Sequence, residues 1–274
     1  MSGTLYIVAT PIGNLEDITL RAVRVLSEAE LIAAEDTRRT RKLLNHLGLR
    51  KKLISFNRHN AKERSTNIIN RLAVHNVALV TDAGTPCISD PGATLVSEAY
   101  DKGFNVIAVP GASAITAALS VSGFFANEFL FLGFLPRMNS ARREILEDFE
   151  SYTRTIVIFE APHRLKSLLS ALFQTWGNRE IVICRELTKL HEEVFRGTIS
   201  EASDFFATPR GEFVLIVQGA SNNVSHRVAD LDDVKEAMQQ AKELGLGRKD
   251  ASQQVSRDLG VPRRQAYEFW ETIN

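Results

Sequence analysis

The fold is decided by VALVTDAGTPCISDPG (residues 77–92), in which four apolar residues run into a loop with two glycines, two prolines and two aspartates. A short apolar run that ends in glycine and proline is typical of a buried strand followed by a shaped loop. Open α/β sheets bind their ligands at the carboxyl ends of such strands. The stretch therefore predicts both a sheet and the edge of that sheet where a ligand site lies.

The first half of the chain repeats this pattern of short β-branched runs and amphipathic stretches. Strand and helix alternate, which predicts a mainly parallel wound sheet. The expected strands are residues 5–8, 31–34, 53–56, 77–80 and 106–109, and the expected helices are residues 19–29, 37–47, 60–74 and 112–122.

A different spacing follows residue 129, with hairpin-like strands at 155–159, 180–184, 193–199 and 212–218 and two helical patterns between them. This spacing indicates an α+β domain with a mixed sheet. A polar stretch at 219–230 precedes three short helical patterns at 231–243, 248–258 and 262–272. We therefore predict domains at residues 1–120 and 121–220 and a small helical module at 221–274.

Composition narrows the class of protein. Basic and acidic residues are equal at 33 each, 44% of residues are apolar, and the two cysteines have no metal-binding or disulfide spacing. The first residues lack the basic start of a signal peptide, and Pro110-Gly111 interrupts an uncharged stretch at 103–127 that is otherwise long enough to suggest a membrane span. We expect a soluble cytoplasmic protein without a resident metal.

Three strand-end loops are candidates for a ligand site: Thr10 to Asn14, Asp82 to Pro86, and Pro110 to Ala114. Their small residues allow backbone N–H and C=O groups to approach a compact polar ligand. The chain contains no GxxxxGK[ST], GxGxxG, HExxH or GxSxG motif, so kinase and dehydrogenase chemistry is not favoured.

These loops, with AEDTRRTRKLL, VPGASAITAALSVSG, FEAPHRL and RELTKLHEEVFRGT, resemble the tetrapyrrole methylase superfamily over nearly all of residues 4–219. Within it, the match is closer to the branch that methylates small-subunit ribosomal RNA. The resemblance implies a homodimer of two-domain subunits that binds S-adenosyl-L-methionine between the domains. It also implies 2′-O-methylation of the ribose of a decoding-site cytidine in 16S ribosomal RNA, on free RNA or on the small subunit.

The family's cofactor contacts can be placed on this sequence by motif matching. The resemblance implies that they are Pro11, Gly84, Thr85, Ile88, Ser113, Ala114, Glu160 and Leu187. Where the superfamily usually has GDP in the third loop, this chain has Gly84-Thr85-Pro86.

A ribose hydroxyl is a poor nucleophile, so a group that accepts its proton would help. The candidates are Lys189 and Glu186, and then Glu35. Lysine could serve only if neutral, which we expect partial burial and the nearby Arg185 to favour. The alternatives are structural: Asp36 as a helix cap, and Arg185 paired with Glu186 across a strand.

Residues 38–64 hold ten basic residues and one acidic residue. Such an unmixed run predicts a surface for RNA phosphates, although a solvated helix face is the alternative. We expect Phe56 and His59 to stack on a base, and Arg142 and Arg143 to extend the surface. The predicted RNA-binding residues are Arg38, Arg39, Arg41, Lys42, Arg58, His59, Lys62, Arg137 and Arg164.

The C-terminal VSRDLGVPRRQAYEFW (residues 255–270) has the pattern of a helix-turn-helix, with Val255, Leu259, Val261, Ala266 and Phe269 on its buried face. Residues 226–274 hold eight basic and nine acidic residues, which favours an accessory RNA-docking module or a structural cap over a DNA reader. Two other functions stay open: a methylase of a small tetrapyrrole-type molecule, and a ligand-sensing regulator that binds DNA.

Overall fold

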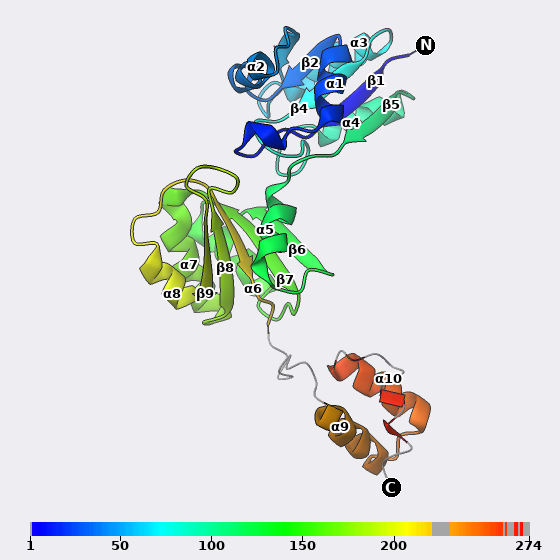
Figure 1. Ribbon diagram of the computed structural model, residues 1–274, viewed down its shortest axis with the longest axis vertical. Coiled ribbons are helices and arrows are strands. Elements are labelled where there is room, and N and C mark those ends of the chain that lie inside the picture. The colour runs from blue at the N-terminus through cyan, green and yellow to red at the C-terminus, as the bar shows by residue number, and fades with distance from the viewer. Residues whose placement is uncertain (1, 221–230, 260, 262–265, 268, 271–274) are drawn as a thin grey trace. The chain divides into compact units, whose positions relative to one another are not determined.

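The computed structural model describes residues 2–220, 231–259, 261, 266–267 and 269–270. The chain divides into two compact units, Met1–Gly219 and Ala220–Asn274. The first unit contains two five-stranded sheets with their helices, and the second unit is helical (Figure 1).

The first sheet is wholly parallel, with strand order β3-β2-β4-β1-β5. Its strands are β1 (Thr4–Val8), β2 (Leu31–Ala34), β3 (Lys52–Ser55), β4 (Val77–Val80) and β5 (Asn105–Val109). The predicted parallel sheet is thus confirmed, and β2 and β4 have the predicted bounds.

Helices cover both faces of this sheet, as the buried strand sequence requires. On one face lie α1 (Leu20–Glu28) and α2 (Thr37–His46), and on the other lie α3 (Ala61–Leu72) and α4 (Ala93–Asp101). Successive residues of β4 alternate between the two cores, with Val77 and Leu79 facing α3 and α4, and Ala78 and Val80 facing α1 and α2. All four are buried, which explains why β4 reads as a continuous apolar run.

The second sheet is mixed, with order β6-β7-β10-β8-β9. β6 (Phe129–Phe134) runs parallel to β7 (Thr155–Glu160), and the remaining pairs, with β8 (Glu180–Arg185), β9 (Glu193–Thr198) and β10 (Phe213–Val217), are antiparallel. The helices of this part are α6 (Asn139–Asp148), α7 (Pro162–Trp176) and α8 (Ile199–Phe205). The mixed sheet is as predicted.

Helix α5 (Ala114–Ser122) belongs with the second sheet rather than the first. Its buried residues Ala118 and Leu119 pack against Val157, Val182 and Ile216. The predicted boundary at residue 120 falls inside α5, whose apolar face packs on the second sheet.

The C-terminal unit contains α9 (Leu231–Glu243) and α10 (Arg248–Leu259) (Figure 1). Val255 and Ala266 are buried, and Leu259, Val261 and Phe269 pack against the same core, as the helix-turn-helix pattern predicts. Most of the third predicted helix, including Arg263 and Arg264, lies outside the described residues.

The uncharged stretch 103–127 forms β5 and α5 with a turn between them. None of the helices in the described part of the chain has the length and apolar character to span a membrane.

Candidate functional site

The three glycine- and proline-rich loops meet at the carboxyl edge of the parallel sheet. Thr10 and Gly84 form an isolated antiparallel bridge, with N to O distances of 2.9 and 3.0 Å. The hydroxyl of Thr85 donates to the carbonyl of Ala112 at 3.4 Å. Loops that follow β1, β4 and β5 are thereby joined into one cradle, as predicted.

Glycine is needed where these loops approach one another. Gly84 has φ +83°, a conformation that residues with a Cβ rarely adopt. A Cβ on Gly111 would lie 3.0 Å from Cβ of Ala9. The backbone of the cradle is therefore held close, with little side-chain bulk over it.

The predicted cofactor contacts on this side occupy the cradle in different ways. Pro11 and Gly84 are buried in it, Thr85 and Ala114 are half-buried, and Ile88 is 47% exposed. Ser113 precedes α5 in an extended conformation, and its hydroxyl does not cap the helix.

The loop after β8 closes against the first of these loops. A Cβ on Gly13 would lie 2.8 Å from the carbonyl oxygen of Leu187 and 2.8 Å from Oγ1 of Thr188. Leu187 is 8% exposed and packs in the core under α5. Thr188 has φ +65°, and its hydroxyl is buried without a hydrogen-bond partner. A buried hydroxyl without a partner in a strained loop is costly, so this position beside the cradle calls for an explanation.

Lys189 is held as a cation between two carboxylates. Its Nζ lies 2.9 Å from Oε1 of Glu186 and 2.6 Å from Oε2 of Glu212. Burial alone would lower the pKa of Lys189, but the bonds to Glu212 and Glu186 outweigh it and raise that pKa above the ordinary value. The expectation of a neutral Lys189 is therefore wrong.

Glu186 is the other member of this pair. Burial acts to raise its pKa, but bonds from Lys189 and the backbone N–H of Glu212 bring the pKa below its usual value. Arg185 pairs with Glu193 across β8 and β9 at 3.1 Å, and not with Glu186. Glu186 is thus an ionised carboxylate in a fixed position.

Glu160 is buried at the end of β7, where its side chain is fully enclosed. Oε1 accepts from the N–H of Ala161 at 2.8 Å and pairs with Nε of Arg164 at 3.2 Å, while Oε2 is buried without a partner. Burial raises its pKa, although the Ala161 N–H and Arg164 oppose the shift. A cofactor contact by this carboxyl would require it to become accessible.

Two arginines predicted to bind RNA are largely buried around the second sheet, where they bond to other residues of the protein. Arg164 is 15% exposed in its side chain and donates to the carbonyl of Leu135 at 2.6 Å as well as pairing with Glu160. Arg142 is 5% exposed and bonds Ser167 and Asn139. Folding therefore removes both from the predicted surface, whereas Arg137 is exposed.

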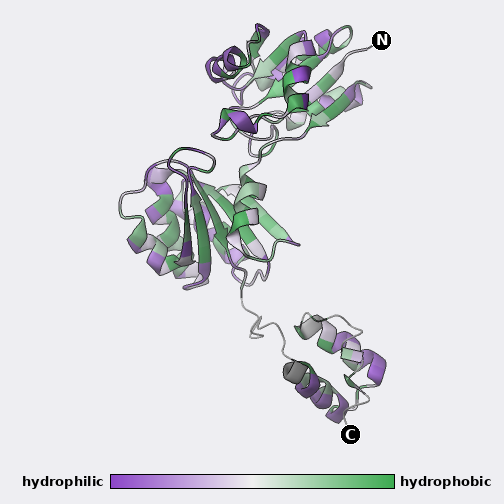
Figure 2. Cartoon of the chain, viewed as in Figure 1, coloured by the Kyte–Doolittle hydropathy of each residue, from purple (hydrophilic) through white to green (hydrophobic). Residues whose placement is uncertain are grey.

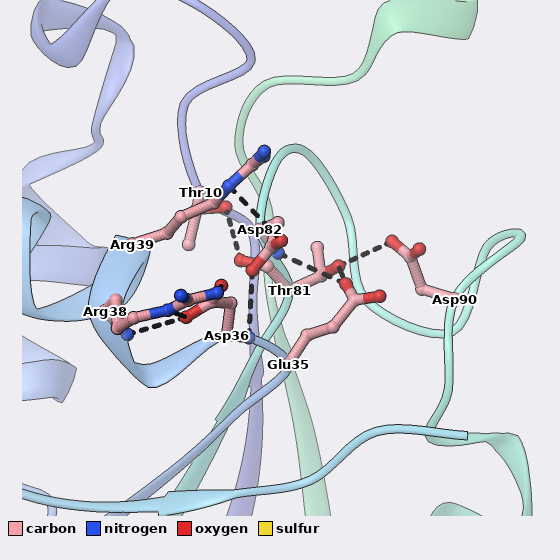
Figure 3. Close-up of polar contacts among 8 residues, drawn as sticks. All are labelled: Thr10, Glu35, Asp36, Arg38, Arg39, Thr81, Asp82 and Asp90. Carbon is pink, nitrogen blue, oxygen red and sulfur yellow. Dashed lines mark hydrogen bonds and ion pairs between the residues drawn. The ribbon is translucent and has the colours of Figure 1, made fainter. Parts of the chain in front are cut away.

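An acidic network lies where β2 and β4 end (Figure 3). The hydroxyl of Thr81 lies 2.7 Å from Glu35 and 2.6 Å from Asp90, and the N–H of Asp36 donates to Asp82 at 2.9 Å. Burial raises the pKa of Asp82, and the charge of Glu35 adds to this shift, although the Asp36 N–H opposes it. Glu35 is thereby tied to the loop after β4.

Asp36 is the cap of α2, as the structural alternative predicted. Its carboxylate accepts from the N–H of Arg38 at 2.8 Å and pairs with the Arg38 side chain at 2.7 Å. The Arg38 side-chain and backbone bonds hold the pKa of Asp36 well below its usual range. The cap fixes the start of the basic helix beside Asp82.

The basic run forms an exposed surface over α2, the turn before α3 and the first turn of α3. Figure 2 shows the hydrophilic colouring of α2. Its exposed members among the predicted residues are Arg38, Arg39, Arg41, Lys42, Arg58, His59 and Lys62. A hollow of about 350 Å³ is lined by Arg38, Arg41 and Lys42 with Thr37 and Asn45. Phe56 is fully buried under the sheet, so the expectation that it stacks on a base is wrong.

A second hollow, of about 830 Å³, lies between α6 and α7, where Asn139, Ser167 and Gln174 line it. No residue of the three cradle loops lines it, so it is a separate feature of the surface. Among the described residues there is no group of three or more metal-ligating side chains placed to hold an ion.

Sequence reasoning missed Thr81, Asp90 and Thr188. Asp90 lies within the ISDPG that follows the loop Asp82 to Pro86, but nothing local indicated that it meets a residue nine positions earlier. The positive φ of Thr188 has no sequence signal, because glycine rather than threonine marks such positions.

Comparisons with known proteins agree with this architecture. Residues 4–203 match the family described as Tetrapyrrole (Corrin/Porphyrin) Methylases. A protein of Halalkalibacterium halodurans named "Ribosomal RNA small subunit methyltransferase I" is 46% identical over 273 residues, which cover 98% of this chain and 94% of that protein. One of the same name from Thermotoga maritima is 50% identical over 220 residues, which cover 79% of this chain and 99% of that protein.

Among solved structures, uroporphyrin-III C-methyl transferase from Thermus thermophilus, complexed with S-adenyl homocysteine, has a TM-score of 0.58. It is 19% identical, and the match covers 79% of this chain and 97% of that one. At this identity the likeness concerns the fold.

Proposed function

This chain belongs to the tetrapyrrole methylase family, and from that premise we propose that it is an S-adenosyl-L-methionine-dependent methyltransferase of small-subunit ribosomal RNA. The finer proposal is that it methylates the ribose 2′-oxygen of a decoding-site cytidine in 16S ribosomal RNA. The names of relatives at 46% and 50% identity support the RNA substrate. The 2′-oxygen and the cytidine rest on the family resemblance.

One observation carries the proposal: the basic helix α2 begins at the cradle. Asp36, which caps α2, donates its N–H to Asp82 of the cradle loop, and Arg39 of α2 lies 3.6 Å from the same carboxylate. An RNA held by the exposed cations of α2 would therefore have a nucleotide close to the three loops. A tetrapyrrole-type substrate needs no such extended basic surface, which disfavours the small-molecule alternative.

The residues of the cradle fit a compact cofactor with polar ends. Backbone groups of the loops at Pro11, Gly84 and Ser113 would hold it from one side, and the loop at Leu187 and Thr188 from the other. Bound S-adenosyl-L-methionine supplies a methyl group on a sulfonium leaving group. The protein then has to keep the accepting oxygen in line with that methyl group and exclude water.

The three candidates for the base have unequal prospects. Lys189 is a cation and cannot accept a proton, and Glu186 is a carboxylate stabilised in its charged form, which makes it a weak base. Glu35 accepts a hydrogen bond from Thr81 and lies on the cradle side of β2. We propose that Glu186 and Lys189 orient the loop at 186–190. Glu35 is then the remaining candidate for accepting the proton of the ribose hydroxyl.

Two wider features belong to the same proposal. We propose a cytoplasmic homodimer, as the family resemblance implies. A solution mass of twice 30.5 kDa is the observation that this part requires.

The test is transfer of labelled methyl from S-adenosyl-L-methionine to small subunits, to naked 16S ribosomal RNA, to a porphyrinogen and to duplex DNA. Label is expected in one or both RNA forms and in neither control. A 2′-O-methyl group blocks alkaline cleavage of the adjacent phosphodiester, so the labelled site should survive as an alkali-resistant dinucleotide. Label on a base rather than a ribose would contradict the finer proposal, and label in the porphyrinogen alone would contradict the RNA substrate.

A further inference from the structure

A single hydroxyl group lies between two carboxyl groups at the start of the cradle loop (Figure 3). Oγ1 of Thr81 is 2.7 Å from Oε2 of Glu35 and 2.6 Å from Oδ2 of Asp90. Thr81 is only 4% exposed, so water has little access to this hydroxyl. Both distances are those of short O–H to O hydrogen bonds.

The number of protons limits how these contacts form. A threonine hydroxyl has one proton to donate, and it also has lone pairs that accept. It can therefore donate to one of the two carboxyl groups but not to both. The second contact is a hydrogen bond only if that carboxyl group is itself protonated and donates to Thr81.

The surroundings decide which carboxyl group holds the proton. Oε2 of Glu35 also accepts from the N–H of Asp82, at 3.4 Å, so it is placed as an acceptor. In the described part of the chain, the carboxyl group of Asp90 has its hydrogen bond with Thr81. Burial raises the pKa of Asp90, and the charges of Glu35 and Asp82 raise it further, against the Thr81 hydroxyl and Arg58.

We propose that Asp90 is a positioning residue of the methyl-donor site. Its protonated carboxyl group donates a hydrogen bond to Thr81, and Thr81 in turn donates to Glu35. This proposal rests on the proposed function, because the donor is the assumed ligand of the cradle. The chain of two hydrogen bonds joins the start of the loop at Thr81, its end at Asp90, and the end of β2 at Glu35.

The loop needs such a closing contact because its backbone is strained. Between residues 84 and 92, φ is positive at Gly84 (+83°), Cys87 (+71°), Ser89 (+61°) and Gly92 (+141°). Cys87 and Ser89 have a Cβ, so these conformations persist only where surrounding contacts hold them. The same loop presents Thr85 and Ile88, which are expected to contact the cofactor.

Loss of the Asp90 proton would place two facing carboxylates around a hydroxyl that can satisfy one of them. The other charged groups near Asp90 are Asp82 and Arg58. The neutral thiol of Cys87 lies on the same loop, and its pKa is raised by burial and by Asp90. Asp36 and Arg39 face Asp82 from α2. Repulsion between Glu35 and Asp90 would then open the loop and weaken donor binding.

The binding test compares the wild type with Asp90→Asn from about pH 4 to about pH 10, using isothermal titration of S-adenosyl-L-methionine. Wild-type affinity is expected to fall by up to about tenfold per pH unit above the pKa of Asp90. The asparagine amide donates to Thr81 at every pH, so the variant should lose this fall. The matched control is Asp101→Asn, an exposed aspartate at the end of α4, which should behave as wild type.

Thermal unfolding without ligand separates this proposal from the proposed function. A carboxyl group whose pKa is raised in the folded state makes its full contribution to the free energy of unfolding below its pKa in the unfolded chain, about 3.9. That contribution is lost as the pH rises through its pKa in the folded state. The melting temperature of Asp90→Asn relative to Asp101→Asn should therefore increase across that window, even if no S-adenosyl-L-methionine binds. Failure of binding alone would count against the proposed function and leave this difference intact.

Parallel pH profiles for Asp90→Asn and wild type would overturn the proposal. A profile flattened by Glu35→Gln but not by Asp90→Asn would also overturn it, since the proton would then lie on Glu35. If Asp90→Asn does not fold, infrared spectroscopy of the wild type gives the answer. A carboxylic acid C=O band that titrates together with the melting temperature supports a held proton, and its absence at neutral pH overturns it.

Discussion

At the scale of the residue, charge state separates positioning from catalysis at Lys189. The ammonium group has two carboxylate partners within 2.9 Å, and its side chain is 28% exposed. These contacts hold the residues after β8 in a conformation where Glu186 and Thr188 have positive φ. Lys189 thus stabilises a strained loop that faces Gly13 of the cradle.

Substitution of Lys189 distinguishes the two roles. Lys189→Arg keeps the charge but cannot accept a proton, so methyl transfer should stay above about a tenth of the wild-type rate if Lys189 only positions the loop. Lys189→Met leaves Glu186 without its cation, and the free energy of unfolding should fall by about 1–3 kcal/mol. Single-turnover rates against pH and chemical denaturation are the measurements.

The control for this pair is Lys102→Met, which changes an exposed lysine after α4. It should alter neither quantity. A Lys189→Arg protein that binds donor normally but is inactive at every pH would show that a neutral lysine takes part in the reaction after all.

At the scale of the element, helix α2 joins the exposed basic surface to the cradle. Its apolar residues Leu43 and Leu44 are buried against the sheet, while its basic residues face outward. The cap by Asp36 and the contacts to Asp82 fix the direction of the helix relative to the loop after β4. We therefore propose that α2 binds RNA phosphates and takes no part in cofactor binding.

Reversal of two charges on α2 tests this division of roles. Arg41→Glu with Lys42→Glu should weaken binding of 16S ribosomal RNA by more than about tenfold and reduce the slope of log affinity against log salt by about 1–2. Both side chains are exposed, so the free energy of unfolding should change by less than about 1 kcal/mol. Fluorescence anisotropy at several salt concentrations gives both numbers for RNA.

Lys166→Glu is the matched control, since it reverses an exposed charge on α7 outside the predicted surface. An equal loss of RNA affinity in this control would mean that total charge, and not α2, governs binding. Affinity for S-adenosyl-L-methionine should be the same in all three proteins.

At the scale of the whole molecule, the family match at residues 4–203 lies within the first compact unit. The match to the Thermotoga maritima protein spans 220 residues and takes in 99% of that protein, while the first unit of this chain ends at Gly219. A relative of that length is shorter than this chain by about the size of the second unit. We infer that the first unit contains the methyltransferase and that the second is an accessory to RNA binding.

Removal of residues 220–274 tests that inference. The remaining chain keeps the cores of both sheets, so it should fold and bind S-adenosyl-L-methionine with an affinity within about threefold of the full chain. Its affinity for 16S ribosomal RNA should fall measurably, and titrations of donor and RNA on both forms check this. Unchanged RNA binding would reduce the second unit to a structural cap, and loss of donor binding would contradict its accessory role.

Local sequence patterns determined most of the elements. Patterns within a few residues were enough to predict the apolar runs of β2 and β4 and the apolar face of α10. The loops were predicted from their proline and glycine residues. Helix α4 was not predicted, because Gly92 precedes it without a capping side chain and only Leu95 and Ala99 are buried along it. Without a cap or a wide apolar stripe, nothing local distinguished it from a loop.

Only the tertiary structure decided what the functional side chains meet. Glu35 and Asp90 lie 46 and 9 positions from Thr81, Arg164 folds back onto Glu160, and Phe56 turns into the core instead of outward. Whether Lys189 is neutral depends on Glu212, which comes 23 residues later, immediately before the neighbouring strand β10. Protonation and exposure depend on partners that folding brings together from distant positions, and a single sequence does not state those distances.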